Sequence, residues 1–181
     1  MGGYSTPRMP TAQSLARLPN GSLFAARPIP KDGESWPGAP LRLSQDNQIG
    51  GLRRLAAIFH LKLYGFTLLE PNTAWDAIIG TGKIEVPSTT KRSTGRRSPY
   101  SRVCVHCLAA DKIPYVRAEW DQPLTLVCSV HDSLLLDHCP ACDRRIDYSR
   151  QEVSRCPCGR IFQEPYRKAP GWIKEMVELF I

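Results

Sequence analysis

Every cysteine of this 181-residue chain lies within one stretch of 55 positions, from Cys104 to Cys158, and residues 1–103 contain none. A disulfide framework needs an even number of cysteines and an exported protein, whereas this chain has seven. Clustered thiols in a reducing compartment bind metal more often than they bind one another. The cysteine distribution therefore predicts metal ligation.

The cysteines form pairs with other ligands at short spacing. Four pairs follow one another along the chain: Cys104 with Cys107, Cys128 with His131, Cys139 with Cys142, and Cys156 with Cys158. Two ligands this close can reach one ion from a tight turn, and two such turns complete a tetrahedron around Zn²⁺. Taken in order, the first two pairs predict a Cys₃His site (site 1) and the last two a Cys₄ site (site 2), with two Zn²⁺ per chain.

Other assignments of the ligands remain open. Only residues 132–138 separate the second pair from the third, so a different pairing is one alternative, and ordinary burial of small apolar thiols is another. His106 and His138 each adjoin a cysteine, but choosing either would leave a cysteine unused or crowd a turn. We therefore predict both outside the ligand sets. His60 lies on an apolar helical pattern, where a packing role is expected.

Both predicted sites are closed, because four protein ligands saturate the ion. Catalytic zinc keeps one position open for water, so these sites are predicted to stabilise the fold. The chain also lacks a Gly-rich phosphate loop, a Gly-x-Ser-x-Gly motif and a His-Glu-x-x-His motif. Zinc deaminases need a His-x-Glu, which is absent as well. We expect a protein without enzymatic activity.

The region before the cysteines is predicted to contain an arm and a helical module. Residues 1–41 are rich in proline and glycine, so 1–25 are expected to form a flexible arm. In the module, 26–90, apolar residues recur at helical spacing from Leu52 to Leu63, with Asn47 or Gln48 before the start and Gly65 at the stop. Arg53, Arg54 and Lys62 occupy the opposite face of this helix.

A second short helix should follow Asn72 or Thr73 and bury Trp75, Ile78 and Ile79. Two helices joined by a short turn are compatible with a helix-turn-helix, although short helices are common and the pattern does not decide it. After the module comes a linker, 91–102, with five basic residues and no acidic one: Lys91, Arg92, Arg96, Arg97 and Arg102. This segment is either a solvated connector or a flexible strap that contacts phosphates.

Residues 103–166 are predicted to form the tandem zinc-finger domain, in which 116–120 and 124–128 have the composition of a hairpin. In the C-terminal helix, 167–181, the apolar residues Trp172, Met176 and Phe180 recur at helical spacing and need a covering partner. The predicted fold class is small, α+β and metal-stabilised: a helix-turn-helix-like module, tandem zinc knuckles of the zinc-ribbon type, and a terminal helix.

The net charge and the hydropathy of the chain limit the classes of partner that it can bind. The formal charge is +7; seven deprotonated thiols and two Zn²⁺ change it by −7 and +4, which leaves +4. A mild positive charge suits a polyanionic partner. No segment resembles a signal peptide or reaches the roughly 18 apolar residues of a membrane span, so we expect a cytoplasmic protein without a membrane partner.

Three segments carry a resemblance to a known family: IPYVRAEW at 113–120, VCSVH at 127–131 and LLLDHCPAC at 134–142. Together they resemble the zinc-finger region of the TniQ/TnsD family, whose members select targets for transposons, including CRISPR-associated ones. Cys104-x-x-Cys107 and the CPCG run at 156–159 fall where the family has them. The resemblance covers residues 99–166.

The opening of the chain also resembles this family. Pro28-Ile29-Pro30, Gly33-Glu34-Ser35 and Arg42-Leu43 are similar to the motif that leads into the family's helix-turn-helix. Pro37 and Pro40 fall in what should be its first helix, and we predict that they interrupt it.

Short members of the family resemble the targeting adaptors of CRISPR-associated transposons that use a single effector nuclease. The resemblance implies a prokaryotic protein, nucleoid-associated when engaged, that bridges a guide RNA–effector complex, or target DNA, and an AAA+ ATPase that recruits transposase. The expected contacts with partners are Arg53, Arg54, Trp172, Met176 and Phe180. A second hypothesis is a sequence-specific DNA-binding protein that recognises a transposon attachment or resolution site, and a third is an enzyme that uses one zinc ion.

Overall fold

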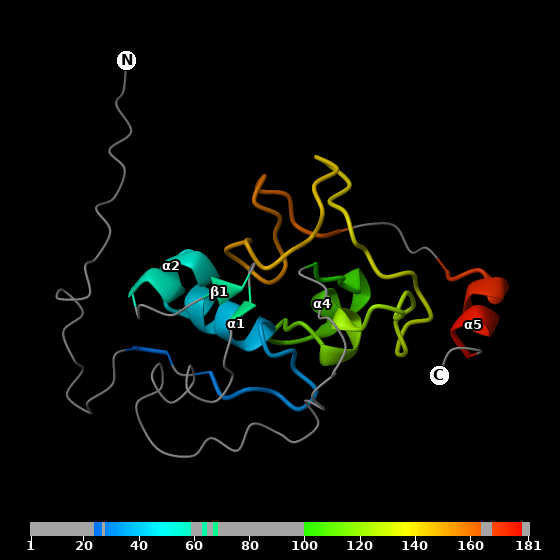
Figure 1. Cartoon of the computed structure of the whole chain (residues 1–181), viewed down its shortest axis with the longest axis horizontal. Helices are drawn as coiled ribbons and strands as arrows, with labels where there is room; N and C mark the ends of the chain where they lie inside the picture. The colour runs from blue at the N-terminus through cyan, green and yellow to red at the C-terminus, as the bar shows by residue number, and fades with distance from the viewer. Residues whose placement is uncertain are drawn as a thin grey trace.

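The computed structural model describes residues 24–26, 28–58, 63–64, 67–68, 100–163 and 168–178. Regular elements within these ranges are short (Figure 1): α1 (Gly38–Asp46), α2 (Leu52–Ile58), β1 (Leu63–Tyr64), β2 (Thr67–Leu68), α4 (Val105–Ala110), the 3₁₀ helix η2 (Ala118–Asp121) and α5 (Gly171–Glu178). No helix of the described part of the chain is long and apolar enough to span a membrane. The helix predicted after Asn72 lies outside the described residues.

Helix α1 begins between the two prolines that were predicted to interrupt it. Pro37 is its N-cap residue and Pro40 lies in its first turn. The prediction is wrong because the first N–H groups of a helix have no partner within it, so a proline there loses no hydrogen bond. Ser35 supplies the missing side-chain cap, since its Oγ accepts a hydrogen bond from the N–H of Gly38 at 3.0 Å.

A tight turn joins α1 to α2. Gln48, Gly50 and Gly51 have positive φ values of 55°, 89° and 101°, and the N–H of Gly51 donates to Ser44 Oγ at 2.7 Å. Helix α2 starts at Leu52, the first residue of the predicted apolar pattern, and Asn47 and Gln48 precede it in the turn.

The predicted extent of that helix is wrong at its far end. Leu63 lies in β1, which pairs antiparallel with β2 and places Leu63 opposite Leu68. Because this pairing engages the backbone at Leu63 in a strand, the helix ends earlier than its apolar spacing indicated. Phe59, His60 and Gly65 lie outside the described residues.

The hairpin predicted over 116–128 does not form. Residues 118–121 form η2, and the segment before it pairs with residues 33–35: Val116 O accepts from Ser35 N at 2.7 Å, and Ala118 N donates to Gly33 O at 2.8 Å. The second predicted strand pairs onward in sequence, through the bridge between Val127 and Leu134. Each of the two segments pairs with a different part of the chain. The local alternation of apolar and polar residues cannot indicate which part that is.

The region of α1 and α2 shares one hydrophobic core with the cysteine-rich region. Leu41, Leu43 and Leu55 belong to the same buried cluster as Val116 and Trp120. The described parts of the two regions are thus packed together. Phe24 belongs to the same buried cluster.

At Gly38, helix α1 packs closely against this core. A Cβ atom added to Gly38 would lie 2.9 Å from Val116 Cβ and 2.7 Å from Ser35 Oγ. A buried polar chain adds to the contact: Ser35 Oγ lies 3.0 Å from Tyr148 Oη, which donates to Asp121 Oδ1 at 2.6 Å. Residues far apart in sequence therefore hold α1 against the cysteine-rich region.

Candidate metal centres

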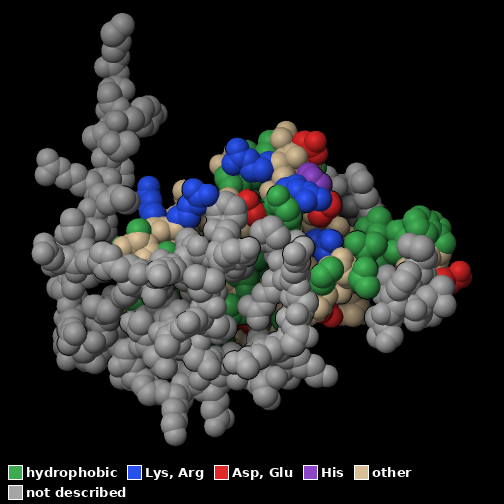
Figure 2. Space-filling view, in the orientation of Figure 1, with side chains coloured by type: hydrophobic (Ala, Val, Ile, Leu, Met, Phe, Trp, Pro, Cys, Tyr) green, Lys and Arg blue, Asp and Glu red, His purple; other side chains and the backbone are tan. Residues whose placement is uncertain are grey.

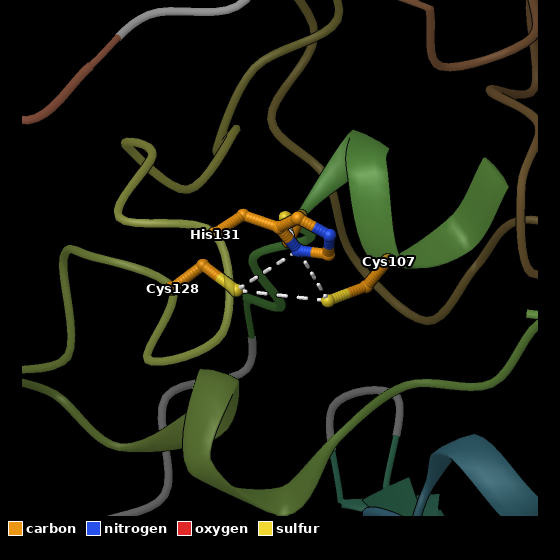
Figure 3. Close-up of side chains that lie close together, drawn as sticks. Cys107, Cys128 and His131 are labelled. Carbon is orange, nitrogen blue, oxygen red and sulfur yellow. Dashed lines mark hydrogen bonds between the residues drawn. The ribbon is translucent and has the colours of Figure 1, made fainter. Parts of the chain in front are cut away.

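Site 1 is assembled from the start of α4 and one tight turn (Figure 3). Cys104 is the N-cap residue of α4, and Cys107 lies in its first turn. Cys128 and His131 come from a turn that closes when Asp132 N donates to Cys128 O at 2.9 Å. Asp132 has a φ of 52°, so the chain reverses immediately after His131.

The ligand atoms of site 1 have the spacing of a zinc tetrahedron. With Zn–S distances of about 2.3 Å, two sulfur ligands lie about 3.8 Å apart, and sulfur and nitrogen about 3.6 Å apart. Cys107 Sγ lies 3.6 Å from Cys128 Sγ, while His131 Nδ1 lies 3.6, 3.2 and 3.8 Å from the sulfurs of Cys104, Cys107 and Cys128. Disulfides are excluded, because an S–S bond is about 2.05 Å long. Zinc fits this group of atoms.

Burial and hydrogen bonding act differently on the three thiols of site 1. Burial is the main cause that raises the pKa of Cys107 and of Cys128, and neighbouring thiols raise them further. Burial also opposes ionisation of Cys104, but hydrogen bonds from Ser133 and from the Cys107 N–H outweigh it and lower the pKa of Cys104. Closely packed, buried thiolates need a compensating cation, so metal binding must displace thiol protons here.

Site 2 consists of two turns of similar construction. Cys139 N donates to Arg144 O, and Cys156 N donates to Arg160 O, both at 2.8 Å. The sulfur of Cys139 lies 3.8 Å from that of Cys158, and the sulfur of Cys142 lies 3.7 Å from that of Cys156. In each site all four ligand atoms lie within 4.8 Å of one another. Both clusters can hold a metal ion.

The two sites differ in exposure. All three cysteines of site 1 are buried, whereas Cys142 and Cys158 of site 2 are exposed. Burial is the largest cause that raises the pKa of Cys156 to about 12, while the N–H of Arg160 is the largest cause that lowers the pKa of Cys158 to about 7. Site 1 lies within the core, whereas site 2 lies at its edge, with Cys139 and Cys156 in the buried cluster and the other two ligands at the surface.

The sequence profile of the TniQ family matches residues 25–135, more than half of the chain. The chain belongs to the TniQ family. The family resemblance inferred from the sequence is thereby confirmed, and membership indicates a role associated with transposition, in a family of non-catalytic targeting proteins. The match includes α1, α2 and all four ligands of site 1, whereas site 2 lies beyond it. No curated protein matches the chain.

The other histidines described in this TniQ-family chain lie outside the two ligand groups. The ring of His106 on α4 lies 5.5 Å from the ring of His131, centroid to centroid. His138 Nδ1 lies 3.0 Å from Asp137 Oδ1. Neither belongs to a four-ligand cluster of the described residues. The structure thus brings together the ligand pairs that the sequence predicted, and neither histidine is among them.

The remaining predicted site residues are only partly described. Lys91, Arg92, Arg96 and Arg97 of the basic linker, and the side chains of Met176 and Phe180, lie outside the described residues. Arg53 and Arg54 are exposed on α2, and Trp172 on α5 is 60% exposed.

Arg102, the last basic residue of the linker, has structural contacts. Its guanidinium donates to the carbonyls of Gln122 at 3.0 Å and Pro123 at 3.3 Å. It therefore ties the end of the linker to the loop after η2.

Two kinds of residue at these sites were not predicted from the sequence. Ser133 is buried, and its Oγ lies 3.4 Å from Cys104 Sγ. No sequence motif predicts this contact. Arg144 and Arg160 each follow the second ligand of a site 2 turn by two positions. That repeated Cys-x-Arg spacing was visible in the sequence and could have drawn attention to them.

Purified protein is expected to retain two equivalents of zinc after extensive dialysis, because each cluster offers four ligand atoms within 4.8 Å. Elemental analysis per chain, with protein concentration from amino-acid analysis, measures this stoichiometry. A value near one or zero would contradict the two four-ligand sets.

Proposed function

We propose that the chain is a non-catalytic target-selection adaptor of transposition. It links a nucleic-acid-bound targeting complex, a CRISPR effector with its guide RNA, to an AAA+ transposition regulator and through it to transposase. The observation that carries the proposal is the TniQ family match over residues 25–135. Two clusters with four protein ligands each support it, because saturated zinc leaves no position for a reacting water.

A rigid body suits an adaptor. The α1–α2 region and the cysteine-rich region share one core, and zinc at both sites would add cross-links within it. A partner that binds such a body orders few additional side chains or loops, so less of the binding free energy is lost to ordering.

The surface proposed for the AAA+ regulator lies at α5. Ala169 N donates to Asp132 O at 3.0 Å, which joins the segment before α5 to the tight turn of site 1, and Ile173 of α5 is buried. Trp172 remains 60% exposed, and Figure 2 shows hydrophobic side chains gathered at this end of the molecule. An exposed tryptophan beside a fixed segment is a typical interface anchor.

The basic face of α2 is proposed for the guide complex or target DNA. Arg53 and Arg54 are adjacent and exposed, while Leu52 and Leu55 bury the opposite side of the helix. The two arginines thus project from a helix whose position is fixed by the core.

The arrangement of α1 and α2 also favours a second candidate, a sequence-specific DNA-binding protein. Two helices joined by residues 47–51 have the connection of a helix-turn-helix, in which the second helix enters the major groove. Binding to random and to attachment-site duplexes at stated salt separates the candidates. A strong preference for one duplex favours the second candidate, whereas weak, sequence-independent binding favours the adaptor.

Replacing Trp172 with alanine is expected to weaken recruitment of the AAA+ regulator at least tenfold, since truncation of an interface anchor commonly costs about 2 kcal/mol or more. Recruitment is measured by pull-down with purified regulator, and zinc content should stay at two equivalents. Ile29→Ala is the matched control, because Ile29 is an apolar side chain that is 80% exposed at the other end of the chain.

The role as a whole is tested in a transposition reaction reconstituted from purified parts. Omission of this protein should abolish targeted insertion. Unchanged frequency and targeting without it would refute the adaptor, whatever its zinc content.

A further inference from the structure

Three exposed arginines lie around site 2: Arg144, Arg145 and Arg160. Among the described residues, none of the three has a side-chain hydrogen bond or an ion pair. Their neighbours differ, since Arg155 pairs with Glu152 at 3.0 Å and Arg150 is buried against backbone carbonyls. Arginines that serve the fold are therefore engaged in this region, and these three are available to a ligand.

The two turns of site 2 place Arg144 and Arg160 in equivalent positions. Each carbonyl accepts from the first cysteine of its own turn at 2.8 Å, and each arginine lies two positions after an exposed ligand, Cys142 or Cys158. Because the four ligand atoms lie within 4.8 Å of one another, the two arginines flank a single metal site. Metal at site 2 would fix their separation.

Arg145 is oriented by an aromatic ring. Its Cζ lies 4.4 Å from the centroid of the Tyr100 ring, and the segments of these two residues are joined by Ser101 N donating to Ile146 O at 3.0 Å. A guanidinium held over a ring keeps its in-plane N–H donors available for the paired oxygens of a phosphate. Tyr100 also lies shortly after the basic residues 91–97 of the linker.

The nearby carboxylates within residues 100–163 do not occupy these arginines. Asp137 contacts His138 at 3.0 Å, Asp147 accepts two bonds from Ser149, and Glu152 pairs with Arg155. Asp143 is exposed and forms no ion pair with any described residue. Figure 2 shows Lys and Arg side chains along the edge formed by the yellow and orange segments of Figure 1, with Asp and Glu side chains and a histidine among them.

We propose that Arg144, Arg145 and Arg160, here called the arginine face, bind the phosphate backbone of a nucleic-acid duplex. The inference deepens the proposed function, because it gives the adaptor a rigid contact with the nucleic acid of its targeting complex. Guanidinium–phosphate contacts position a protein on a duplex without reading its sequence. The arginine face therefore contributes affinity and orientation, and sequence selection is left to the partner.

The test compares two variants with the same change of net charge, −3. R144Q/R145Q/R160Q removes the arginine face. K112E/K168Q makes the same change of charge at two exposed positions outside the turns of site 2. Binding of the isolated full chain to a DNA duplex and to an RNA duplex of the same sequence is measured by fluorescence anisotropy over a series of salt concentrations, together with zinc content.

The arginine-face variant should bind at least tenfold more weakly, and the slope of log K against log salt should fall by about 2 to 3, because each phosphate that is no longer neutralised lowers the slope by about 1. The control variant should change the slope by less than about 1. The preferred duplex, DNA or RNA, identifies which nucleic acid supplies the phosphates. Tyr100→Ala should weaken binding at unchanged charge, and Tyr100→Phe, which keeps the ring, should restore it.

Three results would overturn the proposal. Equal weakening of duplex binding in both variants would show that only the net charge of the chain matters. Loss of zinc with unchanged binding would show that the arginines only offset the charge of the four thiolates. Absence of binding by the unmodified chain to either duplex at low salt would also refute it, and this result would leave the adaptor role to be decided by the reconstituted transposition reaction.

Discussion

Cys107→Ser is expected to unfold the whole described body, whereas Cys142→Ser should release only the metal of site 2. Cys107 is buried in the core that also contains Leu41 and Leu43 of α1. Structural zinc contributes about 10–16 kcal/mol of binding free energy at neutral pH. A small domain has only about 5–15 kcal/mol of total stability. Loss of site 1 therefore removes as much free energy as the fold possesses.

Cys142 is exposed at the surface end of site 2, so its loss should disrupt the turns around it while α1 and site 1 persist. Zinc content together with amide hydrogen exchange in α1 separates the two outcomes. His138→Ala serves as the control and should keep both ions. Equal loss of protection in α1 for both cysteine variants would contradict the difference between the sites, and zinc release by His138→Ala would show that the ligand sets are wrong.

Glu34→Ala is expected to destabilise the fold by about 3–5 kcal/mol, the usual cost of leaving one partner of a buried ion pair alone. Glu34 and Arg42 have side-chain exposures of only 1% and 3%, and their closest atoms lie 2.7 Å apart. The carboxylate also accepts from Lys31 N at 2.8 Å. Urea denaturation measures the free energy of unfolding, provided that zinc content is held constant.

The double variant Glu34→Leu, Arg42→Met provides the control for this prediction. Replacing both charges with apolar side chains removes the unpaired buried charge, so most of the lost stability should return. A cost below about 1 kcal/mol for Glu34→Ala alone would mean that Arg42 finds another partner or water, and that the buried pair is not what holds the opening segment.

The ligand groups could be predicted because the relevant information is local. Cys104 with Cys107, and Cys139 with Cys142, are brought together by single turns, and turn spacing is visible in the sequence. Only the association of one turn with another depended on the fold. Seven cysteines and one histidine left few ways to complete two sets of four ligands.

The pairing of strands and the position of α1 could not be predicted in the same way. The partner of Val116 is Ser35, which no alternation of apolar residues near Val116 can indicate. Pro37 and Pro40 were interpreted as helix-breaking residues, which prolines are in the interior of a helix. Both lie at the start of α1, where proline is tolerated. Arginines with and without partners look identical in a sequence, so Arg145 became informative only once its neighbours were known.

The link between the opening segment and the cysteine-rich region has a consequence for synthesis on the ribosome. Ser35 contacts Tyr148 across 113 positions, and Gln45 accepts a hydrogen bond from Val153 across 108. When α1 leaves the exit tunnel, the residues that cover Leu41 and Leu43 have not yet been made. The nascent chain must therefore remain incompletely folded until its last third is translated, and its folding should be slow, as expected for contacts between distant positions.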